Sequence, residues 1–262
     1  MKKPIVEVLL ASEKRKNVLL LLMDGPKEME LLLESLKTTR TALLPQIRIL
    51  KENHLISKLY GDTYKLTTIG KLIVEEMVVF LRTTDMFGEN RDYLGTHLID
   101  FIPSYLLKKL PQLGSCNIID ISICDFFDAE KDLLEKAIMS KHWLQITSTI
   151  HPEFHEFYVE MIEQDTDVSV IISPEIYEKL KHDYYDDFKE LIDIKLISFY
   201  VYPKSLEFVS FILADQCINF RLFTQEGKSD NKKILICSPN ALEWGKELFE
   251  YYRRQSTPII EI

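Results

Sequence analysis

Two neighbouring stretches decide the fold of the N-terminal part of this chain: residues 36–56, LKTTRTALLPQIRILKENHLI, and residues 64–73, YKLTTIGKLI. In the first stretch, apolar residues recur at the spacing of one helical face, and Thr39 stands before them as a good N-cap. Between the stretches, Tyr60-Gly61-Asp62 is typical of a turn that joins two short strands. The pattern predicts a helix, a hairpin and a second helix, in that order.

Shorter helices precede this pattern, and Ser12 is a good N-cap for one of them. The expected elements are helices at 4–10, 13–23, 27–36 and 40–53, strands at 55–59 and 63–66, and a helix at 69–82. Helices, a tight turn, another helix, a two-stranded hairpin and a closing helix form the order of a winged helix-turn-helix, which is an α+β fold. We therefore expect a winged helix-turn-helix DNA-binding domain over residues 1–85.

The same stretches resemble the ArsR and MarR families of prokaryotic regulators. In these families a recognition helix ends in L-x-x-x-G-L-I, and a wing then leads into Y-x-L-T-x-x-G. The string from Tyr64 to Gly70 is the most specific part of the resemblance. The sequence departs from the pattern at His54, where the families usually have Gly at the C′ position of the helix. The resemblance implies a transcriptional regulator that binds double-stranded DNA.

The predicted recognition helix carries the candidate DNA-binding residues. A helix fits the major groove, where the exposed residues of its first turns reach base edges. Arg40 is the best candidate for a bidentate contact with guanine, and Lys58 and Lys65 on the wing are placed to reach phosphate or the minor groove. The full expected set is Thr39, Arg40, Thr41, Leu44, Pro45, Gln46, Arg48, Lys58 and Lys65.

Pro45 lies inside the predicted recognition helix, where proline removes a hydrogen bond and bends the axis. Two alternatives follow. Either the helix is kinked, or its regular part starts near Pro45 and residues 39–44 form a looser turn. Either alternative changes which residues read the bases, and either could alter or abolish DNA binding.

The net charge of −9 is divided unevenly along the chain. Residues 1–85 carry 14 Lys and Arg against 11 Asp and Glu, whereas residues 86–262 carry 18 against 30. Phosphate would repel the acidic body, so DNA contact is expected only in the mildly basic head. No apolar run is long enough to span a bilayer, and the N-terminal apolar stretch is too short for a signal peptide. These patterns predict a cytoplasmic protein with no membrane contact.

Residues 86–115 are expected to form a linker region with a helix at 96–110, which Pro103 interrupts. Over residues 116–262, strand and helix patterns first alternate and then give way to consecutive strands, which predicts an α/β domain with a mixed sheet. The expected strands lie at 117–123, 143–148, 168–172, 195–201, 207–213, 217–223 and 233–237, and the expected helices at 128–139, 153–163, 174–184 and 239–254.

Two strand-to-helix junctions in this body repeat one pattern. Both pass through Ser-Pro, with Ser173 and Ser238 as expected N-caps. Shared local rules account for the repeat, and a duplicated half-domain of the phospholipase D type is the alternative. That enzyme family requires H-x-K-x-x-x-x-D, and no histidine of the body is followed two residues later by Lys. A phospholipase D-like fold would therefore lack the catalytic motif.

The segment from about residue 118 to 252 resembles the middle domain of methanogenesis regulatory proteins, a family of archaeal regulators. The strings at 144–159 and 241–253 carry this resemblance, and in that family a winged helix precedes the domain. The resemblance implies transcriptional regulation through an effector-responsive domain and supplies no ligand.

Ligands of α/β sheets bind near the C-terminal ends of strands. This rule predicts an effector site, for an unknown small molecule or protein, at Thr147, Ser148, His151, Ser173, Tyr200, Tyr202 and Ser238. The sequence has no Gly-rich phosphate loop, no G-x-S-x-G and no metal-spaced cluster, so we expect no enzymatic activity, no metal and no cofactor.

The four cysteines, Cys116, Cys124, Cys217 and Cys237, lie in or beside apolar, strand-like runs, and none forms a CxxC pair. They are expected to be small buried hydrophobes in a reducing compartment. A redox sensor is the alternative, although no obvious pair stands out.

Taken together, these patterns predict a homodimeric transcription factor whose acidic body senses a small molecule or a partner. Two other hypotheses stay open at this point. One is an enzyme whose winged helix serves only as a protein-interaction module, and the other is a scaffold in which Pro45 has abolished DNA reading.

Overall fold

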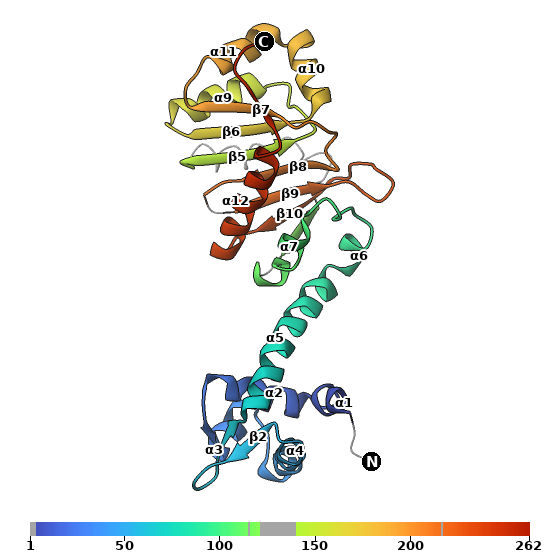
Figure 1. Ribbon diagram of the computed structural model, residues 1–262, viewed down its shortest axis with the longest axis vertical. Coiled ribbons are helices and arrows are strands. Elements are labelled where there is room, and N and C mark those ends of the chain that lie inside the picture. Colours follow the sequence, from blue (N-terminus) through green and yellow to red (C-terminus); the bar gives the residue numbers. More distant parts are fainter. Residues whose placement is uncertain (1–3, 115, 121–139, 216) are drawn as a thin grey trace. The chain divides into compact units, whose positions relative to one another are not determined.

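The computed structural model describes residues 4–114, 116–120, 140–215 and 217–262 (Figure 1). The chain divides into two compact units, Met1–Thr84 and Asp85–Ile262. Each unit has its own hydrophobic core, because the apolar side chains of the first unit form one buried cluster and those of the second form two others.

Apart from the short strand β1, the first unit has the predicted order of elements. Its helices are α1 (Ile5–Leu10), α2 (Glu13–Leu21), the short 3₁₀ helix η1 (Leu22–Asp24), α3 (Met29–Ser35), α4 (Arg40–Glu52) and α5 (Thr68–Glu89), which continues past residue 84. Its strands are β1 (Lys27–Glu28), β2 (Ile56–Lys58) and β3 (Thr63–Leu66), which form an antiparallel sheet in the order β1-β3-β2. The predicted winged helix-turn-helix is confirmed by this arrangement.

Local sequence rules explain where several of these helices begin. The Ser12 hydroxyl accepts a hydrogen bond from the Arg15 amide and thereby caps α2 (3.4 Å). Thr39 caps α4 in the same way through the Ala42 amide (3.4 Å). The apolar stripe predicted for α4 is fully buried in the core of the unit at Leu43, Ile47 and Leu50.

The helix expected at 27–36 begins later than predicted. Lys27 and Glu28 form strand β1 and pair with Tyr64 and Thr63 of β3, so that α3 starts only at Met29. The pairing partner lies some 35 residues further along the chain, beyond the reach of local periodicity.

The wing-to-helix string has a structural reason at two of its residues. The Thr67 hydroxyl donates to the His54 carbonyl (2.6 Å) and accepts from the Gly70 amide (2.9 Å), which joins the end of α4 to the start of α5. A Cβ at Gly70 would stand 1.9 Å from the Leu55 carbonyl oxygen. Only glycine allows the backbone of α5 to approach Leu55, just before β2, this closely.

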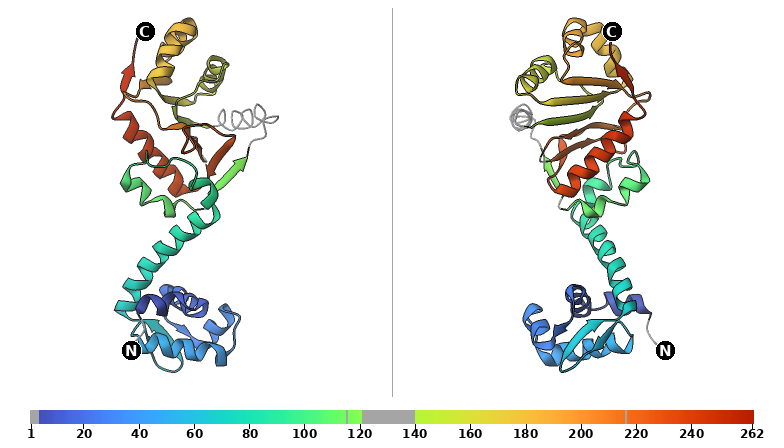
Figure 2. Two further views of the ribbon diagram at one scale, coloured as in Figure 1. Left: turned by 90° about the vertical axis from the view of Figure 1, so that its right-hand side faces the viewer. Right: turned by 60° about the vertical axis from the view of Figure 1, so that its left-hand side comes forward.

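The second unit is built on one eight-stranded mixed sheet, ordered β11-β7-β6-β5-β8-β9-β10-β4 (Figure 2). Strands β5, β6 and β7 are parallel, and the remaining neighbours are antiparallel, as a mixed sheet requires. The strands are β4 (Asn117–Asp120), β5 (His142–Thr147), β6 (Asp167–Ile172), β7 (Ile197–Val201), β8 (Phe208–Leu213), β9 (Ile218–Leu222), β10 (Lys232–Ile236) and β11 (Thr257–Ile259).

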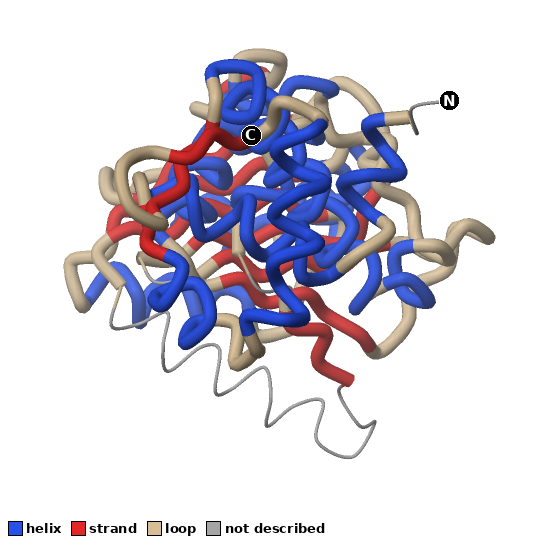
Figure 3. Tube along the Cα trace, turned by 90° about the horizontal axis from the view of Figure 1, so that it is seen from below, coloured by secondary structure: helices blue, strands red, loops and turns tan. Residues whose placement is uncertain are grey.

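Helices cover both faces of this sheet, as the tube in Figure 3 and the views in Figure 2 show. Helix α12 (Pro239–Arg253) packs on one face over β5, β8 and β9. On the other face lie α9 (Phe154–Glu163), α10 (Pro174–Asp183) and α11 (Tyr185–Ile192), which contact β6 and β7 and one another. Helix α11 and strand β11 were not predicted, and the helix expected at 128–139 lies outside the described residues.

The helix expected at 96–110 is wrong. Only short helices occur here: α6 (Arg91–Leu94), α7 (Ser104–Leu107) and the 3₁₀ helix η2 (Leu110–Gln112). The Leu98 amide donates to the Phe223 carbonyl (2.8 Å), and the Trp244 indole donates to the Leu106 carbonyl (3.0 Å). These long-range partners replace helical hydrogen bonds. Within the expected linker region 86–115, Tyr93, Ile102, Leu106, Leu110 and Leu113 are core residues of the second unit.

Two cysteines depart from the expectation of separate buried thiols. Cys217 and Cys237 form a disulfide. The sheet register explains why these two cysteines meet. Strands β9 and β10 pair antiparallel with Ile218 opposite Ile236, and each cysteine lies one residue beyond that pair. Cys116 is a free, half-buried thiol, and burial raises its pKa to about 11.

Candidate functional site

Helices α3 and α4 form the helix-turn-helix of the first unit. Helix α3 ends in a tight reversal in which the Thr38 amide donates to the Leu33 carbonyl and the Lys37 amide to the Glu34 carbonyl (both 3.1 Å). Lys37 adopts a left-handed conformation there, with φ of 45°. This double hydrogen bond is a Schellman motif, and it turns the chain directly into the cap of α4.

Helix α4 presents one face to solvent. Opposite its buried stripe, the side chains of Arg40, Thr41, Leu44, Pro45 and Arg48 are all exposed, as the prediction of a reading surface requires. Thr39 is exposed as the cap, whereas Gln46 is half-buried. Among the described residues, the Gln46 Oε1 atom has no hydrogen-bond partner. The structure thus collects most of the predicted α4 residues on a single accessible surface.

Pro45 lies inside α4, which runs without interruption from Arg40 to Glu52. The alternative of a regular helix that starts only near Pro45 is therefore wrong. Because proline has no N–H, the Thr41 carbonyl lacks its usual helical donor. Thr41 and Pro45 are both exposed, so this carbonyl lies on the solvent side of the helix, where the missing helical bond costs little.

Arg40 joins the helix to two carboxylates. Its guanidinium bonds to Glu30 of α3 (3.0 Å) and to Asp62 of the wing. Asp62 also receives hydrogen bonds from the Lys58 ammonium (2.8 Å) and from the Tyr64 hydroxyl (3.1 Å). The hydrogen bond from Lys58 has the largest effect and lowers the pKa of Asp62. The bonds from Tyr64 and Arg40 lower this pKa further. Two of the predicted DNA-binding cations are thus paired with one carboxylate.

The wing presents one residue that the sequence prediction selected and one that it did not. Lys65 is exposed on β3, as predicted. Tyr60, at the tip of the turn, was not selected and is 98% exposed. An aromatic ring at a wing tip is well suited to contact a minor groove or a sugar. The turn signal itself pointed to Tyr60, since the tip of a hairpin projects from the domain. The pairing of Asp62 with Arg40 had no local signal, because the two residues lie 22 positions apart in the chain.

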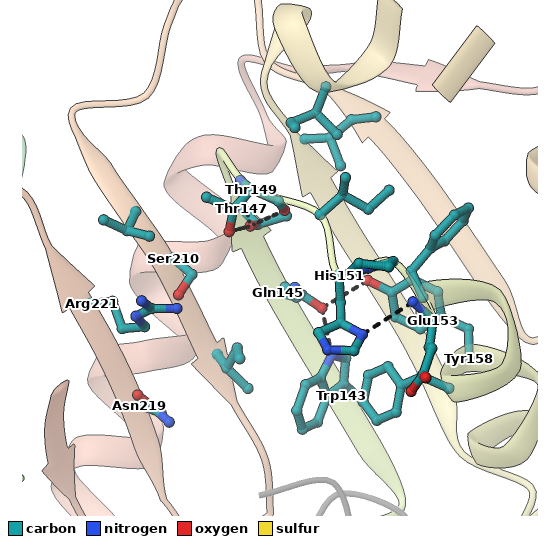
Figure 4. Close-up of a pocket in the computed structure, with 18 of the residues that line it drawn as sticks. Trp143, Gln145, Thr147, Thr149, His151, Glu153, Tyr158, Ser210, Asn219 and Arg221 are labelled. Carbon is teal, nitrogen blue, oxygen red and sulfur yellow. Dashed lines mark hydrogen bonds between the residues drawn. The ribbon is translucent and has the colours of Figure 1, made fainter. Parts of the chain in front are cut away.

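The second unit contains a cavity of about 580 Å³ over the sheet face that α9 and α10 border (Figure 4). Strand register aligns Thr147 with Ser210 and Ser210 with Arg221 across β5, β8 and β9. In the next row, Gln145 stands opposite Ile212, and Ile212 opposite Asn219. All of these side chains line the cavity.

Gln145 is held in one orientation on this wall. Its Oε1 atom accepts hydrogen bonds from the Trp143 indole (3.0 Å) and from the Tyr158 hydroxyl (2.9 Å), as Figure 4 shows. An indole N–H can only donate, so the oxygen of the Gln145 amide must face Trp143. Burial raises the pKa of Tyr158, which therefore stays a neutral donor.

Two of the predicted effector residues lie at this cavity, namely Thr147 and His151. The Thr147 hydroxyl donates to the Thr149 carbonyl (2.7 Å), and His151 Nδ1 accepts from the Glu153 amide (3.1 Å). Both side chains therefore shape the loop between β5 and α9, which forms one edge of the cavity.

The structure places the other predicted effector residues elsewhere. Ser173 and Ser238 cap α10 and α12, and Ser148 donates to the Phe208 and Val209 carbonyls. Tyr200 and Tyr202 pack on the opposite side, against the core beneath α12. The reason is strand alternation: Phe199 of β7 lines the cavity, so its neighbour Tyr200 faces away. The cavity residues that sequence analysis missed, chiefly Gln145, Asn219 and Arg221, are brought together by register alone.

The described ranges contain neither a metal-binding cluster nor a membrane-spanning helix. No group of three or more His, Cys, Asp or Glu side chains is placed to hold a metal ion. The Nε2 atom of His155 instead lies 3.2 Å from the Oε2 atom of Glu190 on α11. None of the described helices is both long and apolar enough to cross a membrane.

The chain is similar in sequence to one family of regulators. The model of the N-terminal domain of methanogenesis regulatory protein FilR1 matches residues 4–85, and the model of its middle domain matches residues 126–255. Methanogenesis regulatory protein FilR1 of Methanothrix harundinacea (strain 6Ac) is 23% identical over 271 residues, which cover 98% of this chain and 58% of that protein. The chain thus spans a little over half the length of this curated relative.

Solved structures show weaker likenesses. TrmBL2, described as an archaeal chromatin protein with a novel mode of DNA binding, aligns at 12% identity and a TM-score of 0.43, covering 97% of this chain and 98% of its own. Nuc, a phospholipase D family member from Salmonella typhimurium, aligns at 13% identity and a TM-score of 0.43, covering 56% and 99%. TM-scores of this size do not establish a shared fold.

The two family models match in the order in which the two units occur, and together they span most of the chain. The expected resemblance to methanogenesis regulatory proteins is confirmed. This protein belongs to the family of methanogenesis regulatory protein FilR1.

Proposed function

We propose that this protein binds double-stranded DNA through its first unit and acts as a transcriptional regulator. The observation that carries the proposal is the exposed face of α4 from Arg40 to Arg48, beside the hairpin β2–β3. A helix with such a face fits the major groove, and the hairpin reaches the flanking backbone or minor groove. Membership of a family of regulatory proteins supports the same function.

In this proposal the protein works as a homodimer in the cytoplasm. Two copies of the first unit read a pseudo-palindromic site whose half-sites lie about one helical turn apart. The second unit is a binding domain rather than an enzyme, and its cavity receives an effector. The effector changes DNA binding only to the extent that it binds two arrangements of the dimer with different affinities.

The test is selection of binding sites from random DNA, followed by fluorescence anisotropy on the selected duplex. Arg40→Ala should weaken binding about tenfold or more and relax the preference for one base pair, because a bidentate contact contributes about 1–3 kcal/mol of discrimination. Arg82→Ala on α5, an exposed site with the same change of charge, should leave the base preference unchanged. Failure to enrich any sequence at low salt would overturn the proposal.

A further inference from the structure

The sheet face beneath the cavity changes from apolar to polar along the sheet. On β6 and β7 the residues of this face are apolar and lie under α9–α11, as at Val170 and Phe199. On β5 and β8–β10 the cavity-lining residues of the same face are mostly polar: Gln145, Thr147, Ser210, Asn219, Arg221 and Lys233. The opposite face of β8 and β9 is wholly apolar, as a face covered by α12 requires.

Three of these polar side chains present groups without a hydrogen-bond partner in the described part of the chain. Asn219 is only 5% exposed and Ser210 only 8%, yet neither side chain bonds to another described residue. The NH₂ group of the half-buried Gln145 also has no described partner, because Trp143 and Tyr158 engage only its oxygen. Buried polar groups are normally paired with protein, water or ligand. A bound molecule with acceptor atoms would satisfy all three.

The charged residues of the cavity are separated by position. Arg221 stands directly beside Ser210 in the sheet register, and Lys233 lies on the neighbouring strand, so both cations belong to the polar wall. The acidic residues that line the cavity are exposed and lie on or next to α9: Glu153, Glu156 and Glu160. Solvent screens these carboxylates more than it screens the wall beneath. The cations therefore lie beside the hydrogen-bond donors of the sheet, whereas the acidic rim disfavours a ligand with more than one negative charge.

An apolar wall borders the polar one. Trp143 and Phe157 stand edge to face with ring centroids 5.6 Å apart, and Ile176 and Phe199 close the side under α10. A cavity of about 580 Å³ has the size of small-molecule sites, which combine apolar walls with a few converging polar groups. The two walls meet on β5, where the Trp143 indole donates to Gln145.

We propose that this cavity binds a small organic monoanion with a carboxylate head and an apolar body. The carboxylate accepts hydrogen bonds from the Gln145 and Asn219 amides and from Ser210, within the positive field of Arg221, and the hydrocarbon part lies against Trp143 and the residues under α9 and α10. The inference deepens the proposed effector role and rests on that role only for its regulatory meaning.

The first experiment measures binding to the full chain, without DNA, by isothermal titration calorimetry. The probes are octanoate and 3-phenylpropanoate, with the neutral amides octanamide and 3-phenylpropanamide as matched partners. Hydrogen bonds to an ionised acceptor are about twice as strong as neutral ones. Each carboxylate should bind at least tenfold more tightly than its amide. Equal affinity within each pair, or no binding of either carboxylate at millimolar concentration, would overturn the proposal.

The second experiment locates the head group. Gln145→Glu keeps an oxygen acceptor for Trp143 and Tyr158 but replaces the NH₂ donor by a negative oxygen of the same size, so octanoate affinity should fall at least tenfold. Gln164→Glu, at the exposed C-terminus of α9, makes the same change of charge outside the cavity lining. This variant should alter the affinity for octanoate less than twofold. Equal effects of the two variants would refute the assigned position.

A loss of folding is separated from a loss of binding by a second variant and a second readout. Arg221→Gln should also weaken octanoate binding at least tenfold while changing octanamide binding by no more than about twofold. A variant whose cavity had collapsed would instead bind neither ligand. Thermal melting of each variant checks that the second unit is folded. Because no DNA is present, carboxylate binding stands or falls independently of the proposed regulatory function.

Discussion

Arg40 has a structural role in addition to its proposed role in DNA binding. In the DNA-free state it bonds to Glu30 and Asp62, so it ties together α3, α4 and the wing. Phosphate or a guanine edge would have to replace these carboxylates. The lowered pKa of Asp62 keeps it ionised throughout the neutral range. Its pairing is present above the unfolded-state pKa and is lost only as the pH falls through the lower folded-state value.

At the residue scale, we expect Asp62→Asn to strengthen DNA binding. The substitution removes a negative charge that competes with DNA for Arg40 and Lys58, while its amide oxygen still accepts from Tyr64. Since exposed ion pairs contribute little, the expected gain is about two- to fivefold at low salt. Anisotropy titrations measure it, and Asp24→Asn, exposed after α2, is the control for charge alone. Weaker binding by Asp62→Asn would mean that Asp62 orients Arg40 for its contact.

At the scale of elements, the end of α4 shows how the chain tolerates histidine where the resemblance to ArsR and MarR regulators leads us to expect glycine. His54 adopts a left-handed conformation with φ of 58°. Its amide donates to the Lys51 carbonyl (2.9 Å), and the Leu55 amide donates to the Leu50 carbonyl (3.0 Å). These two bonds form a Schellman motif, and the completely buried Leu50 and Leu55 supply its apolar part. The motif forms although its C′ residue is not glycine.

His54→Gly should therefore raise the free energy of unfolding of the first unit by about 1 kcal/mol, because glycine has no Cβ to oppose the left-handed conformation. Urea denaturation followed by far-UV circular dichroism measures the change. His54→Ala keeps the Cβ and should give no comparable gain. If both variants gave the same stability, the conformation of residue 54 would not be a source of strain.

At the scale of the whole molecule, the two units depend on different kinds of constraint. The first unit is closed by caps, a hairpin and one apolar core. In the second, strands far apart in sequence share one sheet, and the Cys217–Cys237 disulfide links two adjacent strands. Reducing agents should therefore affect the second unit alone.

We expect reduction of this disulfide to lower the free energy of unfolding of the second unit by about 3 kcal/mol, the contribution typical of a cross-link that closes a loop of this length. Denaturation with and without a phosphine reductant measures the loss. The double variant Cys217→Ser, Cys237→Ser should be insensitive to the reductant, and Cys116→Ser should respond as the parent does. A parent protein indifferent to reduction would show that the cross-link does not stabilise the fold.

The features that could be predicted from the sequence are those whose causes lie within one or two helical turns. The caps at Ser12, Thr39, Ser173 and Ser238 each depend on an amide three residues ahead. The stripe of α4 and the hairpin at Gly61 likewise follow from local spacing and local backbone preference. These signals sufficed for the winged helix and for the mixed α/β body.

Other features depend on partners that are distant in the chain. Strand β1 exists because β3 pairs with it, and the segment at 96–110 is not helical because Phe223, just after β9, and Trp244 of α12 bond to its backbone. The same reason places Gln145, Asn219 and Arg221 on one wall, since β-register selects which side chains meet and local periodicity does not. Local sequence patterns therefore predict most of the fold of this protein, whereas its candidate binding site is formed by long-range pairing of β-strands.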